Sequence, residues 1–163
     1  MSVSPARSRR RPPAGRVTLR PAEAGDCRRI WLWRNDEETR RASLGAAPIP
    51  FDTHERWFAR SLRSRARKIY VVLADGRASG VARLDLDEGQ GTVSLHLAAE
   101  WRGRGVGPAA IEALAELAFG PLGLRSLRAS VKRENSRSIS AFRKAGFTLA
   151  SEGEVLCLEK IRR

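Results

Sequence analysis

The chain contains few of the residues that build covalent or metal frameworks. Its 163 residues include two cysteines, Cys27 and Cys157, and two histidines, His54 and His96. Two cysteines are too few for a disulfide framework or a zinc cluster, and this scarcity is typical of a reducing cytoplasm. We therefore expect no metal site and a cytoplasmic protein.

Long apolar runs are also missing. No segment approaches the roughly 20 consecutive apolar residues that a membrane span requires. The basic N-terminal residues are not followed by the apolar core of a secretory signal peptide. A length of 163 residues suits one domain with a single core. The sequence thus predicts one soluble domain with no membrane partner.

Acidic residues are absent from the first sixteen positions, which carry Arg7, Arg9, Arg10, Arg11 and Arg16. Because this stretch is also rich in proline and serine, we expect a disordered basic tail at 1–15 and a folded domain at 16–163. The whole chain has a net charge of +13, which would attract either nucleic acid or a phosphate-rich small ligand. A solvated tail is the favoured interpretation, and we do not expect a nucleic-acid partner.

A glycine-rich turn limits the function most. The run from Arg102 to Gly107 reads Arg-Gly-Arg-Gly-Val-Gly. Before it, 93–97 alternates apolar and polar residues as a strand does, and after it 109–119 places apolar residues at helical spacing. Glycines let the backbone approach a ligand, and the N–H groups at a helix start carry partial positive charge.

This turn therefore predicts an anion site, most simply a phosphate site. Arg102 and Arg104 add guanidinium groups, which suit phosphate oxygens. The alternative is a tight strand-to-helix connection with no ligand, because a glycine-rich turn alone is weak evidence.

A second block supports the ligand. The Arg-x-x-Gly-x-Gly pattern at Arg102, Gly105 and Gly107 is followed by 131–147, which contains Asn135 and ends in Lys-Ala-Gly-Phe. Together the two blocks resemble the acyl-CoA pyrophosphate loop and the strand, Asn and helix of the GNAT N-acetyltransferase superfamily. The resemblance covers about 16–161.

The resemblance implies an α/β (α+β) GNAT fold, with a mixed, mostly antiparallel sheet of about seven strands and helices on both faces. It implies acetyl-CoA as cofactor. The residues that it assigns to cofactor binding are Leu97, Ala98, Ala99, Arg102, Gly103, Arg104, Gly105, Val106, Gly107, Asn135, Ser138 and Phe142.

The local patterns agree with this fold. We predict strands at 17–20, 69–73, 79–86, 93–97, 127–131, 147–149 and 155–158, and helices at 26–34, 36–41, 52–65, 109–119 and 136–144. Asp26, Asn35 and Asp52 are the predicted N-caps of the first three helices. Asp75-Gly76 is a strong hairpin turn.

Acetyl transfer requires a thioester held beside a neutral amine, which positioning alone strongly favours. By analogy with the family, the backbone of Leu97 to Ala99 would hold the thioester oxygen. His96 is the candidate base, because its pKa lies near neutrality. Asp85 would orient it or act as the base, with Glu55 and His54 as further candidates. The alternative for His96 is a hydrogen-bonded structural histidine.

Phe142 departs from the family pattern. Many relatives place a tyrosine there, whose phenol is thought to protonate the departing thiolate. Phenylalanine has no proton to give, although a thiol of pKa about 8.5 leaves tolerably without one. Ser138 or a water would be the substitute.

The acceptor must contact the N-terminal half. The runs 31–36 (Trp-Leu-Trp-Arg-Asn-Asp) and 54–58 (His-Glu-Arg-Trp-Phe) resemble the GNAT branch that acetylates UDP-linked 4-amino sugars in pseudaminic-type nonulosonic acid pathways. The resemblance makes Trp33, Arg34, Asn35, His54 and Trp57 substrate-binding residues. Tryptophans at helical spacing are also common core residues, so that alternative stays open.

Three functions follow. The first is an acetyl-CoA-dependent N-acetyltransferase for a small-molecule primary amine, most simply a nucleotide-linked amino sugar. The second is a protein N-terminal, lysine or aminoglycoside-type acetyltransferase. The third is a non-enzymatic module that binds acyl-CoA or nucleic acid. The sequence leaves a homodimer open.

Overall fold

The computed structural model describes residues 11–163, so most of the predicted tail lies outside the described residues. The strands are β1 (Val17–Pro21), β2 (Arg67–Ala74), β3 (Arg77–Asp87), β4 (Gln90–Leu97), β5 (Ser126–Lys132), β6 (Thr148–Glu152) and β7 (Val155–Ile161). The α-helices are α1 (Cys27–Asn35), α2 (Glu37–Ala42), α3 (Phe51–Arg63), α4 (Val106–Phe119) and α5 (Ser136–Lys144). Short 3-10 turns occupy Ala24–Asp26 and Ala99–Trp101.

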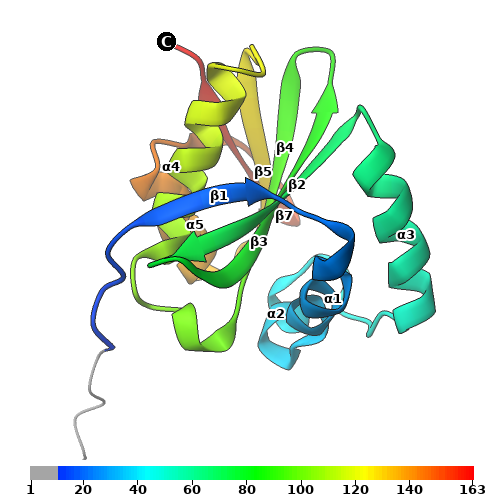
Figure 1. The fold of residues 1–163 in the computed structure, drawn as a ribbon. Coiled ribbons are helices and arrows are strands. Elements are labelled where there is room, and N and C mark those ends of the chain that lie inside the picture. Colours follow the sequence, from blue (N-terminus) through cyan, green and yellow to red (C-terminus); the bar gives the residue numbers. More distant parts are fainter. Residues whose placement is uncertain (1–10) are drawn as a thin grey trace, which may run out of the picture.

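The strands form one seven-stranded sheet in the order β1-β2-β3-β4-β5-β7-β6. Every neighbouring pair is antiparallel except β4 and β5, which run parallel. Helices α1 and α3 lie on one side of this sheet and α4 and α5 on the other (Figure 1). The predicted fold class is therefore confirmed, element by element.

Two tight hairpins fix the register of the central strands. Asp75 and Gly76 both have positive φ, 52° and 76°, as the turn between β2 and β3 requires. Glu88 and Gly89 repeat this geometry between β3 and β4. As a result, Val81 lies opposite His96 on the neighbouring strand.

Strands β4 and β5 pair over only three residues. Gln90 to Thr92 pairs with Ser126 to Arg128, and the two strands then part. The closed end is tightly packed, because a Cβ on Gly91 would lie 2.6 Å from a Leu84 methyl carbon and 2.9 Å from a Leu127 methyl carbon. The rest of this β4 edge is not paired with β5.

The two faces of the sheet bury different cores. Alternate β2 to β4 residues, such as Val72 and Leu84, pack with Ile111 and Leu114 of α4. On the opposite face, the smaller core joins α1 and α3 to β2 and β3 through Ile30, Phe58, Ile69 and Val81. This smaller core leaves a cavity beneath α1 and α3.

The predicted helix caps were wrong in detail. Asp26 is the N-cap residue of α1, as predicted, but its side chain makes no cap hydrogen bond. Its carboxylate accepts instead from Arg20 at 2.7 and 2.8 Å and from the Glu23 N–H at 2.8 Å. Helix α2 is capped by Asp36, whose carboxylate accepts from the Thr39 N–H at 3.1 Å. The Asp26 carboxylate is thus occupied by the Arg20 guanidinium and is not available to the N–H groups at the start of α1.

Helix α3 has no side-chain cap either. It begins at Phe51, its N-cap residue is Pro50, and Asp52 lies in its first turn. There the exposed Asp52 carboxylate is 3.8 Å from Arg56. Such a contact at the surface contributes little to stability.

Within residues 11–163, no helix has both the length and the apolar character that crossing a bilayer requires. In the same part of the chain, no group of three or more His, Cys, Asp or Glu side chains has a metal-binding arrangement.

Candidate active site

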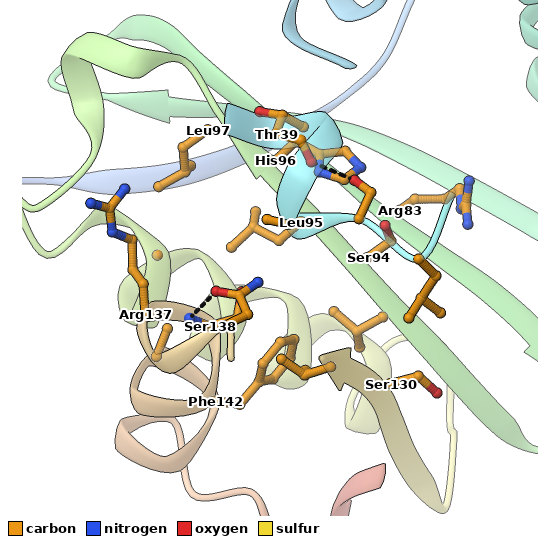
Figure 2. A pocket seen from close by; sticks show the side chains of 18 of the residues that line it. Thr39, Arg83, Ser94, Leu95, His96, Leu97, Ser130, Arg137, Ser138 and Phe142 are labelled. Atoms are coloured by element: carbon orange, nitrogen blue, oxygen red, sulfur yellow. Dashed lines mark hydrogen bonds between the residues drawn. The ribbon is translucent and has the colours of Figure 1, made fainter. Parts of the chain in front are cut away.

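Two cavities meet beside β4. One, of about 420 Å³, lies where β4 and β5 part and is bounded by α2 and α5. The other, of about 430 Å³, lies beneath α1 and α3. We call them the groove and the pocket. Arg34, Arg83, Ser94 and His96 line both, so these four residues mark the junction. Figure 2 shows the groove, with β4 facing Ser138 and Phe142 of α5.

The open edge of β4 offers backbone groups to a ligand. The Ala98 N–H donates to the Ser79 carbonyl at 2.8 Å, which fixes the alternation of the β3–β4 ladder. Because that ladder uses every second residue, the N–H and C=O groups of Leu95 and Leu97 point away from β3, toward the groove. An extended ligand chain with amide groups can hydrogen-bond there.

This alternation corrects part of the predicted thioester site. Leu97 lines the groove and presents a free edge, as expected. The Ala98 N–H is already used by Ser79, and Ala99 begins a 3-10 turn outside the groove lining. Of the three predicted backbone positions, Leu97 is the one that the geometry supports.

The glycine loop leads from β4 into α4. Gly103 and Gly105 have φ of 70° and 78°, and a Cβ on either would meet no atom within 4 Å. Gly105 is the N-cap residue of α4, whose first N–H groups have no partner within the helix. Open space, left-handed backbone and unpaired N–H groups together fit an anion such as a diphosphate.

Other predicted loop residues play different parts. Gly107 lines the groove, and a Cβ there would lie 3.6 Å from the Ala141 Cβ. Val106 is buried in the core beneath α4, so only its backbone faces the loop. Residues 103–106 do not line the groove themselves, but they connect Arg102 and Gly107, which do.

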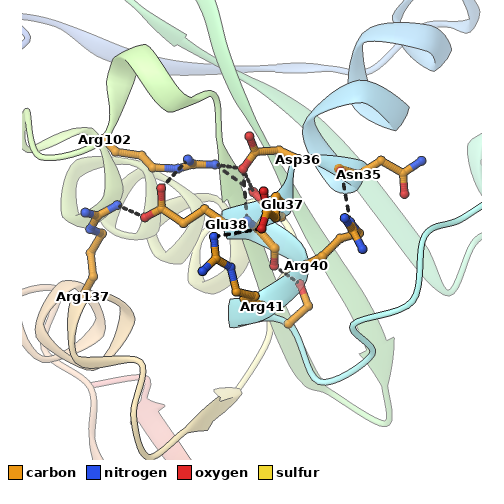
Figure 3. Close-up of polar contacts among 10 residues, drawn as sticks. Asn35, Asp36, Glu37, Glu38, Arg40, Arg41, Arg102 and Arg137 are labelled. Carbon is orange, nitrogen blue, oxygen red and sulfur yellow. Dashed lines mark hydrogen bonds and ion pairs between the residues drawn. The ribbon is translucent and has the colours of Figure 1, made fainter.

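The guanidinium groups of the two loop arginines, Arg102 and Arg104, are occupied by other protein groups. The Arg102 guanidinium is 2.7 Å from Asp36 and 2.9 Å from Glu38, and its side chain is only 12% exposed (Figure 3). Arg104 lies over the Trp101 ring at 4.3 Å and donates to the Pro12 carbonyl at 2.8 Å. The prediction that both arginines supply phosphate charge is therefore not supported.

Arg102 instead ties α2 to the loop. The Glu38 carboxylate contacts Arg102 through one oxygen and Arg137 of α5, at 2.9 Å, through the other. Arg102 also donates to the Thr39 hydroxyl at 2.8 Å. Helix α2 is thus held across one end of the groove by side chains from both of its walls (Figure 3).

The predicted α5 residues all line the groove. The Asn135 side-chain oxygen caps α5 by accepting from the Ser138 N–H at 3.1 Å. Phe142 is buried and packs edge-to-face on Phe147, with ring centroids 5.0 Å apart. Phe142 therefore serves the core and the groove wall at once, and Ser138, about one turn earlier on this helix, also lines the groove.

His96 lies at the junction, on the same face of the sheet as Ser94 and Arg83. Burial, together with the charges of Arg34, Arg83 and Arg102, lowers the pKa of His96 to about 4. The ring is therefore neutral at physiological pH and has a nitrogen lone pair available to accept a proton.

Asp85 lies elsewhere, and its predicted role was wrong. It pairs with Thr92, four residues along β4 from His96, and lines neither cavity. Its carboxylate is 2.5 Å from Arg67 and 3.0 Å from Arg83. Two arginines hold it, so it neither orients His96 nor reaches the junction.

Two of the predicted acceptor residues are structural. Trp33 packs between the two cores and lines neither cavity. The Asn35 side chain donates to the Ile49 carbonyl and accepts from the Ile49 N–H, both at 2.8 Å. Trp31 donates to the same carbonyl at 2.7 Å. The Trp-Arg-Asn run thus fixes the 43–50 loop, and only Arg34 faces the cavities.

His54 and Trp57 do line the pocket. The His54 Nε2 donates to the Cys27 carbonyl at 3.1 Å, and burial lowers the pKa of this ring. Trp57 lies below two guanidinium groups, with Arg67 at 5.2 Å and Arg83 at 5.7 Å from its centroid. His54 therefore forms part of the pocket wall, and the Trp57 ring packs against Arg83, which also lines the pocket.

Sequence reasoning missed several residues of the junction. Arg83 and Ser94 come from adjacent strands, and they meet only because the hairpin register sets them opposite one another. The turn at Glu88 and Gly89, between β3 and β4, sets this register. Arg137 and the 43–45 loop gave no local signal, because their position depends on α2 and α5 approaching in space.

Comparison with known proteins agrees with this geometry. A family model described as acetyltransferase (GNAT) domain matches residues 16–148. Spermidine N(1)-acetyltransferase of Escherichia coli (strain K12) is 25% identical over 148 residues, covering 89% of this chain and 78% of that protein.

Solved structures share the fold. The spermidine N-acetyltransferase of Vibrio cholerae, in complex with CoA and spermine, has a TM-score of 0.81 at 20% identity, covering 89% of this chain and 95% of that one. AAC(6')-Ib, in complex with paromomycin and acetyl-CoA, has a TM-score of 0.80 at 20% identity, covering 90% and 93%.

Proposed function

Because this chain belongs to the GNAT acetyltransferase family, we propose that it transfers an acetyl group from acetyl-CoA to the primary amine of a nucleotide-linked amino sugar. The family supplies the reaction class, which is N-acetyl transfer. The observation that carries the choice of acceptor is the charge of the pocket beside the groove.

The donor lies in the groove in this proposal. The glycine loop at Gly103 and Gly105 binds the diphosphate through backbone N–H groups, and the free edge of β4 at Leu95 and Leu97 binds the amide-rich arm. Acetyl-CoA supplies the acetyl group as a thioester. Phe142 and Leu97 keep the reacting end away from bulk water.

The acceptor lies in the pocket. Arg34, Arg60 and Arg83 line it, and no Asp or Glu does so among the described residues. A cationic lining favours an acceptor that carries negative charge beside its amine, and repels a polycation. A sugar joined to a nucleoside diphosphate has both an amine and negative charge.

The junction then brings amine and donor together. His96 is neutral at working pH and accepts the amine proton, directly or through a water. The Ser94 hydroxyl lies beside it on the same strand and face and can hydrogen-bond the acceptor. Leu97 directs its N–H toward the groove, where it can stabilise the oxyanion.

Thiol release from acetyl-CoA tests this proposal directly. The panel contains a UDP-linked 4-amino sugar, spermidine, kanamycin and a short peptide with a free N-terminus. We expect turnover with the amino sugar and at least about tenfold lower kcat/KM with the others, because a tenfold preference needs only about 1.4 kcal/mol of charge complementarity.

The relatives named for spermidine and for aminoglycosides define the competing acceptor class, a polyamine or aminoglycoside. Faster turnover with spermidine or kanamycin than with the amino sugar would favour that class and reject ours. Thiol release with no member of the panel, at any salt concentration, would reject the proposed acceptor class altogether.

A further inference from the structure

At the junction, two arginine side chains each have one buried nitrogen without a hydrogen-bond acceptor. Within residues 11–163, Arg34 Nη1 and Arg83 Nε are buried and have no hydrogen-bond partner. Both residues line the groove and the pocket. An unsatisfied buried donor on a charged group is costly, so an acceptor group is expected to complete it.

Arg34 is held in place by its other nitrogen. It lies in the last turn of α1, and its Nη2 donates to the Gly45 carbonyl at 2.9 Å. Burial and the charges of Arg83 and Arg40 lower the pKa of Arg34. Two other arginines, and no carboxylate among the described residues, therefore contribute to this shift.

Arg83 approaches from the sheet. It lies opposite Ser94, and its guanidinium lies 5.7 Å from the Trp57 ring centroid. The Nε is 3.0 Å from an Asp85 oxygen, but its N–H is not directed at that oxygen. Since Asp85 also pairs with Arg67, its single charge is shared between two arginines.

We propose that Arg34 and Arg83 bind an acidic group of the acceptor, a phosphate or a carboxylate, and that Arg83 thereby determines acceptor specificity. Guanidinium forks match both oxyanions, and the bonds are strengthened by charge in a partly buried site. This inference rests on the proposed function, because it takes the pocket as the acceptor site.

The arrangement also limits the shape of the acceptor. Arg83 and His96 lie on adjacent strands and the same face, two residues apart along the register. Diagonal neighbours of this kind are about 7 Å apart at the backbone. Both side chains line the same junction, so the acidic group and the reacting amine belong to one compact acceptor rather than to the two ends of a long linker.

Binding experiments test this inference without acetyl transfer. Calorimetric titrations use the full chain saturated with coenzyme A, so that the groove is filled. The probes are UDP, glucuronate as the carboxylate probe, and uridine as the neutral counterpart of UDP. We expect UDP to bind at least tenfold more tightly than uridine, and the two acidic probes reveal which oxyanion is preferred.

Four variants separate charge from folding. Arg83→Gln removes the charge, Arg83→Lys keeps it without the fork, and Arg34→Gln removes the second guanidinium. Arg63→Gln is the control. Arg63 is an exposed arginine at the end of α3 and lines neither cavity. Thermal unfolding of each variant identifies any that fails to fold.

We expect Arg83→Gln to weaken binding of UDP or glucuronate at least tenfold, Arg83→Lys to weaken it less, and Arg63→Gln to leave it within twofold. Uridine binding should be insensitive to Arg83→Gln. Equal losses for Arg83→Gln and Arg63→Gln, or acidic probes that bind no better than uridine, would overturn the inference.

The two proposals fail separately. Arginine-dependent binding of an acidic probe without turnover of the UDP-linked amino sugar would reject that acceptor and keep the anion site. Turnover of the amino sugar with an acceptor KM that Arg83→Gln does not change would keep the function and reject the anion site. If Arg83→Gln unfolds, Arg83→Lys and Arg34→Gln decide by the same criteria.

Discussion

The groove and the pocket are built in different ways. The glycine loop after residue 102 and the open edge of β4 offer backbone N–H and C=O groups to a ligand of the groove. The pocket instead offers side chains from α1, α3, β2, β3 and β4. A backbone site recognises what all donors of one class share, whereas a side-chain site can change its charge while the fold stays the same.

Relatives and solved structures of similar fold carry the names of different acceptors. The described residues lining this pocket include three arginines and no carboxylate, while similar structures contain spermine or paromomycin. The predictions that follow test whether the two sites are separable, beginning with the largest expected effect.

Gly105→Val should disable the groove. Gly105 has φ of 78°, and a valine there would be strained by about 1–2 kcal/mol or more and would fill the open space of the anion site. We expect affinity for acetyl-CoA to fall at least about 100-fold, measured by calorimetry, because backbone donors to a diphosphate would be blocked.

Gly123→Val is the matched control. Gly123 has φ of 64° and open space around its Cβ position, but it lies in the connection between α4 and β5, outside the groove lining. The strain should be similar and the acetyl-CoA affinity unchanged. Equal loss of affinity in both variants would mean that strain, not a phosphate site, explains the effect.

His96→Gln should reduce turnover at the junction. General base catalysis contributes on the order of 100-fold or more, so we expect a fall of that size in kcat with little change in the KM for acetyl-CoA. Because the pKa of His96 is about 4, the acidic limb of the wild-type kcat/KM profile should report the acceptor amine. An unchanged kcat from pH 6 to pH 9 would make His96 structural.

Stability should fall on acidification because of His96. Its pKa is about 4 when folded and about 6.5 in an unfolded chain, so between these values the unfolded chain binds the extra proton. Stability is fully present above pH 6.5 and falls toward pH 4, by at most about 3 kcal/mol. Urea unfolding at pH 7 and pH 5 should show a smaller loss for His96→Gln than for wild type.

Asp36→Ala should loosen α2 from the groove. It removes both the N-cap and a carboxylate partner of Arg102, and we expect about 1–2 kcal/mol of destabilisation by urea unfolding. Asp36→Asn can still cap the helix, so it should lose less. Equal losses would mean that the ion pair to Arg102, rather than the cap, carries the effect.

Trp31→Phe gives the smallest effect and tests the pocket alone. It removes one hydrogen bond to the Ile49 carbonyl but keeps the aromatic packing on Phe51, so we expect about 1 kcal/mol of lost stability. Because Ile49 lines the pocket, the KM for the acceptor should rise about twofold to fivefold, with the KM for acetyl-CoA unchanged. A matching rise in both would mean that the two sites are not separable.

The same contrast determines what the sequence predicts. The glycine loop, Asn135 and Phe142 are close in sequence to the elements that they serve, and the groove lies where their motifs placed it. The hairpin at Asp75 and Gly76 was also predicted. These features depend on local backbone geometry.

The errors arose where long-range partners compete for a side chain. Arg102 was expected to serve the phosphate but is held by Asp36 of α2, and Asp85 was expected near His96 but is held by Arg67. Asn35 was expected to cap a helix, but its side chain hydrogen-bonds the backbone of Ile49 in the 43–50 loop. Such choices depend on which charges and carbonyls the fold brings close.

The most direct test is a crystal structure of the chain with coenzyme A. We predict the diphosphate on the N–H groups of the 103–107 loop, and the thiol end between β4 and α5, next to His96 at the junction with the pocket. A diphosphate bound elsewhere, or a thiol end remote from His96, would contradict the account.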